Sequence, residues 1–305
     1  MTTAAPVGPS ALPVAVRPGL TWTDASLVLM ATIWGANFAA MKLGAQQFPP
    51  LAFNASRLLI GTVLMLLVAV ARGGQWPGRR TTVRLMLLGV IGNGLYQVFF
   101  VEAILRTRVA SVAIMLASTP IWLALVGQLM GTEHLTRRAW SGIALSLVGI
   151  LLVVMGGATA SGGGHTWTGD LFALAGVACW STYTVLLRPL AVATDAVKLH
   201  AITLVGGTVP LLLFAMPELA RTQWGTVSLG GWGALAYGAL GAIIVAYLLW
   251  YRGVRVLGPT RTAMYGNLQP IVALVVGALL LGEVPSVAQG VGCGFTVAGL
   301  LLTRT

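Results

Sequence analysis

The chain has 305 residues, of which 57% are hydrophobic and only 8% are charged. A soluble surface normally carries about 25% charged residues, so this composition excludes a soluble globular protein and indicates a chain that lies in a lipid bilayer. The formal net charge is +11, but the basic residues lie at segment ends and in short loops. This distribution argues against nucleic acid as a partner, because a nucleic-acid site gathers basic residues on one face.

The first 20 residues contain four prolines and a single basic residue, Arg17. They lack both the basic start and the continuous apolar core of a secretory signal peptide. We therefore expect residues 1–20 to form a disordered cytoplasmic tail.

Ten apolar segments follow the tail, and each is close to the length of about 20 residues that a helix needs to cross the hydrocarbon core. In chain order they cover roughly residues 24–44, 51–71, 83–103, 109–130, 138–156, 169–189, 197–216, 232–252, 259–281 and 286–303. The sequence therefore predicts an all-α integral membrane protein with ten transmembrane helices.

A pattern that occurs twice divides these segments into two sets of five. Pro-x12-Glu-x8-Gly-x6-Gly begins at Pro120 and again at Pro270, and its acidic members are Glu133 and Glu283. Because five is odd, the second set must enter the membrane from the opposite side, and we expect two inverted repeats. Inverted repeats are typical of secondary transporters, which bind their substrate near the midplane. The expected domains are a first repeat at 21–156, an external linker at 157–167 and a second, inverted repeat at 168–305.

The basic residues predict the orientation of the chain. With a cytoplasmic N-terminus, 13 Lys and Arg residues fall on the cytoplasmic side, and only Lys42, Arg106, Arg108 and Arg221 fall on the other. Cytoplasmic loops of membrane proteins carry an excess of Lys and Arg. We therefore expect both termini to lie in the cytoplasm.

Polar and aromatic side chains within the predicted spans are the candidates for lining a cavity. In the third segment, Asn93, Tyr96, Gln97 and Phe100 follow helical spacing, which places amides and rings on one face. Amides and hydroxyls can meet amino or carboxylate groups, and rings can stack on the apolar part of a solute. The full set of candidate substrate-binding residues is Trp34, Asn37, Asn93, Tyr96, Gln97, Phe100, Met115, Ser118, Thr119, Trp180, Tyr183, Tyr247, Met264, Asn267 and Gln269.

Pro120 and Pro270 are expected near the middle of the fourth and ninth segments, where a proline removes one backbone hydrogen bond. Lipid cannot satisfy a freed carbonyl, so such a position is tolerated only against protein or a water-filled cavity. The two prolines either kink their helices or mark the substrate site. We group them with Arg57 as gating or structural residues.

Arg57 is the basic residue placed deepest in a predicted span. An ionisable side chain at membrane depth is a candidate functional residue, because burying its charge is costly. The guanidinium of Arg57 either reaches the external interface, or it binds a substrate carboxylate or a helix-end carbonyl of the other repeat.

The other ionisable groups are expected away from the cavity. All seven acidic residues fall at predicted helix ends or in loops, and we expect Asp24 and Asp170 to be N-caps. His200 is expected at a solvated helix end, and Trp250 and Tyr251 are expected in the belt of aromatic residues at the membrane interface. Without a carboxylate at mid-depth, we expect weak or absent proton coupling.

Several of these residues form a recognisable combination. The run Trp34-Gly35-Ala36-Asn37-Phe38 with Lys42, Arg57 and the repeated proline, glutamate and glycine pattern resembles the EamA family of the drug/metabolite transporter superfamily, over about residues 24–303. The resemblance implies a ten-helix carrier of the bacterial inner membrane, often one that exports amino acids or other small metabolites. In the second half, Cys179-Trp180-Ser181-Thr182-Tyr183 replaces the first run.

We therefore expect a secondary transporter that exports amino acids or similar small amphipathic metabolites by alternating access through a central cavity. A carrier or exporter of another metabolite or of a drug-like solute is the alternative. A membrane enzyme would need clustered nucleophiles, acids or metal ligands, whereas His134, His165 and His200 lie in different loops or segment ends. Kinked inverted halves also fit alternating access more directly than a static channel.

The expected partners are a small-molecule substrate and the lipid bilayer, with no nucleic acid. We expect no catalytic residue, no metal and no cofactor. The oligomeric state stays open, and a monomer is compatible with the sequence. The identity of the substrate, the coupling ion and the resting conformation also stay open.

Overall fold

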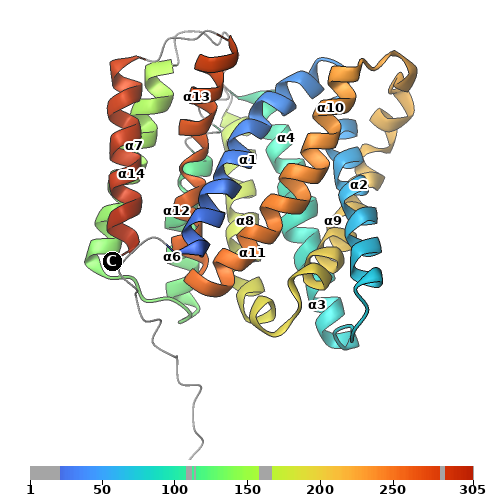
Figure 1. Cartoon of the computed structure of the whole chain (residues 1–305), viewed down its shortest axis with the longest axis horizontal. Helices are drawn as coiled ribbons and strands as arrows, with labels where there is room; N and C mark the ends of the chain where they lie inside the picture. The colour runs from blue at the N-terminus through green and yellow to red at the C-terminus, as the bar shows by residue number, and fades with distance from the viewer. Residues whose placement is uncertain (1–20, 108–111, 113–114, 158–166, 282–285, 305) are drawn as a thin grey trace, which may run out of the picture.

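The computed structural model describes residues 21–107, 112, 115–157, 167–281 and 286–304, and the regular structure in these residues is helical. Figure 1 shows the helices packed side by side along a common direction. In chain order the elements are α1 (Trp22–Ala45), α2 (Pro50–Ala71), α3 (Arg79–Gly89), η1 (Val90–Leu95), α4 (Tyr96–Arg106), α6 (Thr119–Leu129), α7 (Arg137–Gly157), α8 (Trp167–Ala193), α9 (Ala196–Arg221), η3 (Trp224–Thr226), α10 (Leu229–Tyr237), η4 (Gly238–Val245), α11 (Ala246–Leu257), α12 (Pro259–Gly266), α13 (Gln269–Leu281) and α14 (Val287–Arg304).

Six helical stretches within the described residues are long and apolar enough to cross a membrane. They are Trp22–Ala45, Pro50–Ala71, Arg79–Arg106, Trp167–Ala193, Ala196–Arg221 and Leu229–Leu257. The expected tail at 1–20 lies outside the described residues. Most of the expected linker at 157–167 and the repeated residue Glu283 also lie outside them.

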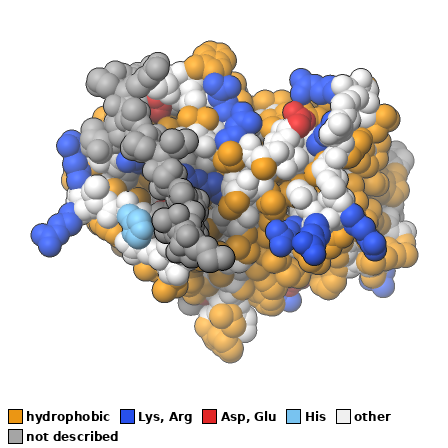
Figure 2. Space-filling view, turned by 90° about the horizontal axis from the view of Figure 1, so that it is seen from below, with side chains coloured by type: hydrophobic (Ala, Val, Ile, Leu, Met, Phe, Trp, Pro, Cys, Tyr) orange, Lys and Arg blue, Asp and Glu red, His pale blue; other side chains and the backbone are white. Residues whose placement is uncertain are grey.

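The outer surface of the helices is strongly apolar. Leu129 is 88% exposed, Leu229 is 89% exposed and Val287 is 85% exposed, and many other large apolar side chains are also exposed. Figure 2 shows apolar side chains around the molecule, with Lys and Arg gathered on the end that faces the viewer. Since soluble monomers rarely expose large contiguous apolar patches, this surface is one that lipid covers. The chain is an all-helical membrane protein.

Two of the long stretches contain a π-helical segment. In the third predicted span it is η1, Val90–Leu95, and in the eighth it is η4, Gly238–Val245. Pro120 and Pro270 are 150 residues apart in the repeated pattern. Adding this spacing to residues 90–95 gives residues 240–245, which lie in η4, so the two π-helical segments occupy corresponding positions in the two halves. Such π-helical insertions are rare and occur frequently at functional sites.

The fourth and ninth predicted spans are discontinuous at their prolines. A turn at Ser118 precedes α6, and a turn at Asn267 and Leu268 separates α12 from α13. Pro120 and Pro270 each occupy the second position of the helix that follows, rather than the middle of a kinked helix as expected. Proline is tolerated in a first turn because its missing N–H would have no intrahelical partner there. The backbone is irregular at the expected depth, but the prolines start a helix instead of straining one.

The start of α1 also differs from expectation. Thr21, not Asp24, is the N-cap, and Asp24 at the third helical position completes a capping box by accepting a hydrogen bond from the Thr21 backbone N–H. Asp170 lies in the first turn of α8 and accepts a hydrogen bond from the Thr107 hydroxyl. Both acids therefore stabilise a helix start from inside the first turn, where a negative charge is favoured.

α7 and α14 pack along their length, as Figure 1 shows, and glycines of the repeated pattern lie at the contact. A Cβ atom added to Gly142 would lie 2.7 Å from the Gly299 carbonyl oxygen, and one added to Gly149 would lie 2.6 Å from that of Gly292. The spacing of the repeat pairs Gly142 with Gly292 and Gly149 with Gly299. Each glycine thus contacts the counterpart of the other, which is the reciprocal contact that a two-fold relation produces.

The substitution Gly149→Ala is expected to destabilise the protein. Its Cβ would lie 2.5 Å from the Thr296 backbone nitrogen, so the two helices must move apart. Overpacking of this kind costs about 1–3 kcal/mol. We expect a lower melting temperature for the purified protein in detergent.

Gly290→Ala is the matched control, because a Cβ atom at Gly290 would meet no atom within 4 Å. Both changes reduce the backbone freedom of the unfolded chain alike. Equal melting temperatures for the two variants would contradict the close packing of α7 against α14.

Candidate functional site

A cavity of about 160 Å³ lies among α1, α2, α4, α6, α8, η4, α11, α12 and α13. Its lining residues are Trp34, Asn37, Phe38, Met41, Arg57, Tyr96, Gln97, Phe100, Leu116, Ala117, Thr119, Trp180, Ala242, Ile243, Tyr247, Trp250, Ala263, Gly266, Asn267, Gln269 and Pro270. A single water needs only about 10–15 Å³ of such space, so the cavity has room for a small organic solute.

Aromatic rings form one wall of the cavity. The Trp34 ring centroid lies 6.2 Å from that of Trp180, 5.6 Å from that of Tyr247 and 5.7 Å from that of Trp250. Tyr96 extends the wall, with its ring centroid 5.2 Å from that of Trp180. The contacts are mostly edge-on or tilted, which is the favoured geometry for aromatic pairs and holds the rings in fixed orientations.

The π-helical segment η4 is held in place by side chains from both halves of the chain. The Trp34 Nε1–H donates to the Ala242 carbonyl at 2.9 Å, and His200 Nε2 lies 2.8 Å from the Ile243 carbonyl. Lipid cannot form hydrogen bonds with backbone carbonyls, so an irregular helical segment depends on partners within the protein. These two bonds satisfy the backbone at the point where it borders the cavity.

Arg57 lies on the cavity and is 4% exposed. Its Nε donates to Asn54 Oδ1 at 2.7 Å, and its Nη2 donates to Gln97 Oε1 at 3.3 Å. The Arg57 side chain therefore does not extend to the external interface. Of the two alternatives that the sequence left open for this guanidinium, the one that places it at the interface is wrong. Within the described residues, its hydrogen-bond acceptors are uncharged amides.

The discontinuities of the fourth and ninth spans lie beside the cavity. Ser118 and Thr119 donate their hydroxyls to the carbonyls of Met115 and Leu116, each at 2.5 Å. Asn267 Nδ2 donates to the Ser146 hydroxyl at 2.9 Å. Thr119, Asn267 and Gln269 line the cavity, whereas Ser118 does not.

Ten of the fifteen candidate substrate-binding residues line the cavity. They are Trp34, Asn37, Tyr96, Gln97, Phe100, Thr119, Trp180, Tyr247, Asn267 and Gln269. Of the gating or structural group, Arg57 and Pro270 line it and Pro120 does not. The structure therefore gathers residues from both halves of the chain around one space.

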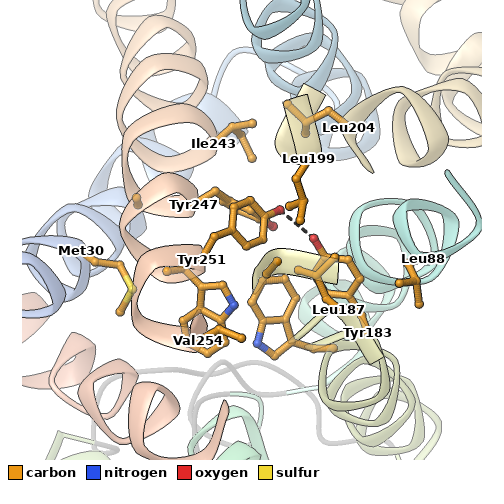
Figure 3. Packing of buried hydrophobic residues seen from close by; sticks show 14 of the residues in the cluster. Met30, Leu88, Tyr183, Leu187, Leu199, Leu204, Ile243, Tyr247, Tyr251 and Val254 are labelled. Atoms are coloured by element: carbon orange, nitrogen blue, oxygen red, sulfur yellow. Dashed lines mark hydrogen bonds between the residues drawn. The ribbon is translucent and has the colours of Figure 1, made fainter. Parts of the chain in front are cut away.

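Five candidates lie elsewhere. Met264 is fully buried, and Met115 packs against the small cluster around Ala103, Val112 and Ala173. The Tyr183 hydroxyl bonds that of Tyr251 at 2.6 Å, as Figure 3 shows. The other two, Asn93 and Ser118, are not among the lining residues, and Asn93 packs on Gly207. These five residues do not line this cavity, and a role for them in binding solute stays a prediction.

Two expectations about the eighth and seventh segments are also wrong. Trp250 and Tyr251 are each 2% exposed, and Trp250 lines the cavity, so neither is an interfacial anchor. His200 is fully buried, with its ring stacked on Tyr247 at 5.2 Å and its Nδ1 3.1 Å from the Tyr251 hydroxyl. A position near a helix end did not predict exposure of these side chains, because neighbouring helices cover the ends of α9 and α11.

Glu133 lies in the connection between α6 and α7 and contacts the second half of the chain. Its carboxylate accepts a hydrogen bond from the Thr260 hydroxyl, and its Oε1 lies 3.8 Å from Arg188 Nη1. Burial raises the pKa of Glu133, whereas the Thr260 bond and the Arg188 charge act against this rise. Gly258 has a φ of +87°, and a Cβ atom there would lie 2.7 Å from Glu133 Oε1, so glycine leaves space for the carboxylate.

Nine lining residues were not among the candidates predicted from the sequence: Phe38, Met41, Leu116, Ala117, Ala242, Ile243, Trp250, Ala263 and Gly266. Phe38 and Met41 follow Trp34 at helical spacing, so a signal for them was present. The others are small or apolar residues whose type does not distinguish a cavity wall from ordinary packing.

Comparison with known proteins agrees with this architecture. A chain in a solved crystal structure superposes with a TM-score of 0.75 and covers 92% of this chain and 96% of its own, at 21% identity, which supports the fold alone. The uncharacterized transporter YyaM of Bacillus subtilis is 26% identical over 274 residues, and the match covers 88% of each chain.

Two further relatives have a similar extent. The uncharacterized inner membrane transporter YedA of Escherichia coli is 26% identical, with 91% of this chain and 89% of the relative covered. A probable terminal-alkyne amino-acid exporter of Streptantibioticus cattleyicolor is 24% identical, with 91% of each covered. The model of the EamA-like transporter family matches residues 21–155 and again residues 167–305. The chain is therefore a membrane transporter that belongs to the EamA-like transporter family.

Proposed function

We propose that the protein is a secondary transporter that exports amino acids or similar small amphipathic metabolites by alternating access. The observation that supports this most directly is the cavity itself, which combines a wall of aromatic rings with the guanidinium of Arg57 and the amides of Asn37 and Gln97. Rings suit the apolar part of such a solute, and the polar groups suit its amino and carboxylate groups.

The architecture proposed for this carrier is ten transmembrane helices in two inverted five-helix repeats, at 21–156 and 168–305 with a linker at 157–167. The reciprocal glycine contacts of α7 and α14 and the paired π-helical segments support it. So does a hydrogen bond of 2.7 Å between the hydroxyls of Thr62 and Thr208. These threonines are 146 residues apart, the same spacing that relates Trp34 to Trp180. Contacts between equivalent positions are expected where a two-fold relation brings the halves together.

We further propose that both termini are cytoplasmic, in a bacterial inner membrane. Figure 2 shows Lys and Arg side chains gathered at the end of the molecule that faces the viewer, which supports that end as the cytoplasmic one. In this orientation, the α1 residues on the cavity lie in its outer half, and Arg57 lies in the outer third of α2. The cavity then faces outward, and the contacts of Glu133 with Thr260 and Arg188 close the cytoplasmic side.

The alternative solutes differ in how well they suit this cavity. A lipophilic cation would need an acidic partner, and no Asp or Glu is among the lining residues that the structure describes. The same absence supports movement of solute down its own gradient, or exchange, rather than proton-driven transport. Another anionic or zwitterionic metabolite remains the alternative to an amino acid.

Solute exchange tests the proposed function. Purified protein in proteoliposomes loaded with an unlabelled amino acid is expected to accumulate the same radiolabelled amino acid, because an alternating-access carrier exchanges solute across the membrane. A panel of amino acids, nucleotide sugars and drug-like cations would be compared with protein-free liposomes. Exchange of a nucleotide sugar or a cation without exchange of any amino acid would overturn the proposal.

Trp180→Ala is expected to weaken apparent solute affinity about threefold to tenfold, since an aromatic contact is worth about 0.5–1.5 kcal/mol. The change removes a ring from the cavity wall, and the Michaelis constant for exchange would report it. Trp167→Ala is the matched control, because Trp167 is 72% exposed at the start of α8. An equal effect of both substitutions would show that the Trp180 ring does not contact the solute.

Glu133→Gln is expected to favour opening toward the cytoplasm, because it weakens the contacts with Thr260 and Arg188. In a variant lacking Cys179 and Cys293, a reporter Ala263→Cys on the cavity would be labelled from the cytoplasmic side with a membrane-impermeant maleimide. We expect labelling to rise about tenfold, the equivalent of about 1.4 kcal/mol.

Glu102→Gln serves as the control for this change, since Glu102 pairs with Arg106 at the opposite end of the molecule. It should leave labelling of the reporter unchanged. Identical labelling of the Glu133→Gln variant and the parent would contradict a closing role for Glu133.

A further inference from the structure

We propose that Arg57 and Asn37 form the recognition pair of the cavity, in which Arg57 binds the carboxylate of a zwitterionic α-amino acid and Asn37 Oδ1 accepts from its ammonium group. This inference rests on the proposed function and deepens it, because it assigns the charged groups of the solute to named atoms. The aromatic wall then takes the side chain of the amino acid.

The first observation is the charge balance at Arg57. The guanidinium is 4% exposed, and its hydrogen bonds within the described residues go to the neutral oxygens of Asn54 and Gln97. The ion pairs formed by these residues do not include it. An unpaired charge in a low-dielectric site is costly. A bound carboxylate would remove this cost, so the site favours an anionic group.

The second observation is the way in which the guanidinium is held. Asn54 lies one helical turn before Arg57 on α2, whereas Gln97 lies on α4, so two elements fix Nε and Nη2. The Phe53 ring lies beneath the group, with its centroid 5.9 Å from Cζ. The described residues form no hydrogen bond with Nη1. Arg57 therefore has a fixed plane and a free donor, which suits the planar geometry of a carboxylate.

The third observation is an acceptor without a donor close to this cation. Asn37 Oδ1 is buried and makes no hydrogen bond within the described residues. Arg57 Nη1 and Asn37 Oδ1 both lie 3.8 Å from the point where a Cβ atom of Gly238 would be, so they are no more than twice that distance apart. A buried acceptor normally has a donor. The ammonium group of an α-amino acid lies two bonds from its carboxylate carbon, and it can supply that donor while the carboxylate meets Arg57.

The aromatic wall provides the remaining part of the site. Trp34 lies one helical turn before Asn37 on α1, and Trp180 and Tyr247 contact its ring. A side chain attached to the same carbon as the ammonium and carboxylate groups would be directed onto these rings. The geometry therefore favours apolar or aromatic α-amino acids over amines, which lack the anion, and over sugars, which lack both charges.

Four small molecules with a common phenyl group test this assignment by calorimetric titration of the purified full-length protein in detergent. They are L-phenylalanine, L-phenylalaninamide, 3-phenylpropanoate and phenethylamine. We expect L-phenylalanine to bind most tightly, and the amide and the amine to bind at least about tenfold more weakly, because they lack the carboxylate. We expect 3-phenylpropanoate to bind more weakly than L-phenylalanine but more tightly than the amide and the amine. Equal binding of L-phenylalanine and its amide, or no binding of L-phenylalanine, would overturn the assignment without any variant.

The variants separate the two roles. Arg57→Gln should weaken the binding of L-phenylalanine and of 3-phenylpropanoate by about tenfold to hundredfold. It should leave the binding of the amide and of the amine nearly unchanged. Asn37→Ala should weaken the binding of L-phenylalanine more than that of 3-phenylpropanoate, because of these two only L-phenylalanine has an ammonium group. Arg221→Gln is the matched control on an exposed arginine at the end of α9 and should change none of the four. Arg57→Lys, which keeps the charge, should retain part of the preference for the carboxylate.

The outcomes distinguish this inference from the proposed function. If Arg57→Gln weakens all four molecules equally, Arg57 only connects α2 to α4, and the inference fails even where amino-acid exchange is intact. If proteoliposomes exchange no amino acid, the proposed function fails whatever the titrations show. If Arg57→Gln does not fold, the preference of the unmodified protein among the four molecules still decides the carboxylate assignment.

Discussion

Every backbone polar group at membrane depth must be satisfied from within the protein, and the cavity lies where this constraint is hardest to meet. The π-helical segment η4 and the broken fourth and ninth spans all border it. Side chains supply hydrogen bonds to some of their carbonyls, including the indole of Trp34 to Ala242 and the hydroxyl of Thr119 to Leu116. Irregular backbone of this kind is tolerated in a membrane protein only against protein or water. The same irregularities that open a space among the helices also direct polar atoms toward it.

The halves of the chain share their backbone irregularities but differ in the side chains that these present. By the repeat spacings, Arg57 corresponds to Thr203, Asn37 to Tyr183 and Gln97 to Tyr247. Thr203 and Tyr183 are fully buried, with their hydroxyls bonded to the His200 carbonyl and the Tyr251 hydroxyl, whereas Arg57 and Asn37 lie on the cavity. The repeated features thus build the scaffold and supply the Trp34–Trp180 pair of the aromatic wall, whereas Arg57 and Asn37 on the cavity have no counterpart of the same type in the second half. A solute with a distinct charged end fits such an asymmetric site better than a symmetric one.

The ends of the first, second and fifth predicted segments lie within two residues of those of α1, α2 and α7, because apolar length and turn residues determine them. The composition of the cavity could be predicted only in part. Asn93 and Gln97 are four residues apart and would share a face of an α-helix, but Asn93 lies in the π-helical segment η1, Val90–Leu95, and does not line the cavity. Local sequence does not reveal a π-helical segment, and η1 packs against α9, which is distant in the sequence. His200 and Trp250 were misplaced for a different reason, since distance from a helix end does not say which neighbouring helix covers that end.

The charge on Arg57 also bears on the proposed alternating-access cycle. The guanidinium is buried against the amides of Asn54 and Gln97, whereas a bound carboxylate would neutralise it under the proposed recognition. Closing the cavity withdraws water and strengthens every electrostatic interaction inside it. An uncompensated cation therefore resists closure more than a neutral pair does. The loaded carrier should then pass through the closed state more readily than the empty one, which makes exchange of one amino acid for another faster than net efflux. The same residue that selects the solute would in this way couple solute binding to the opening of the contacts around Glu133.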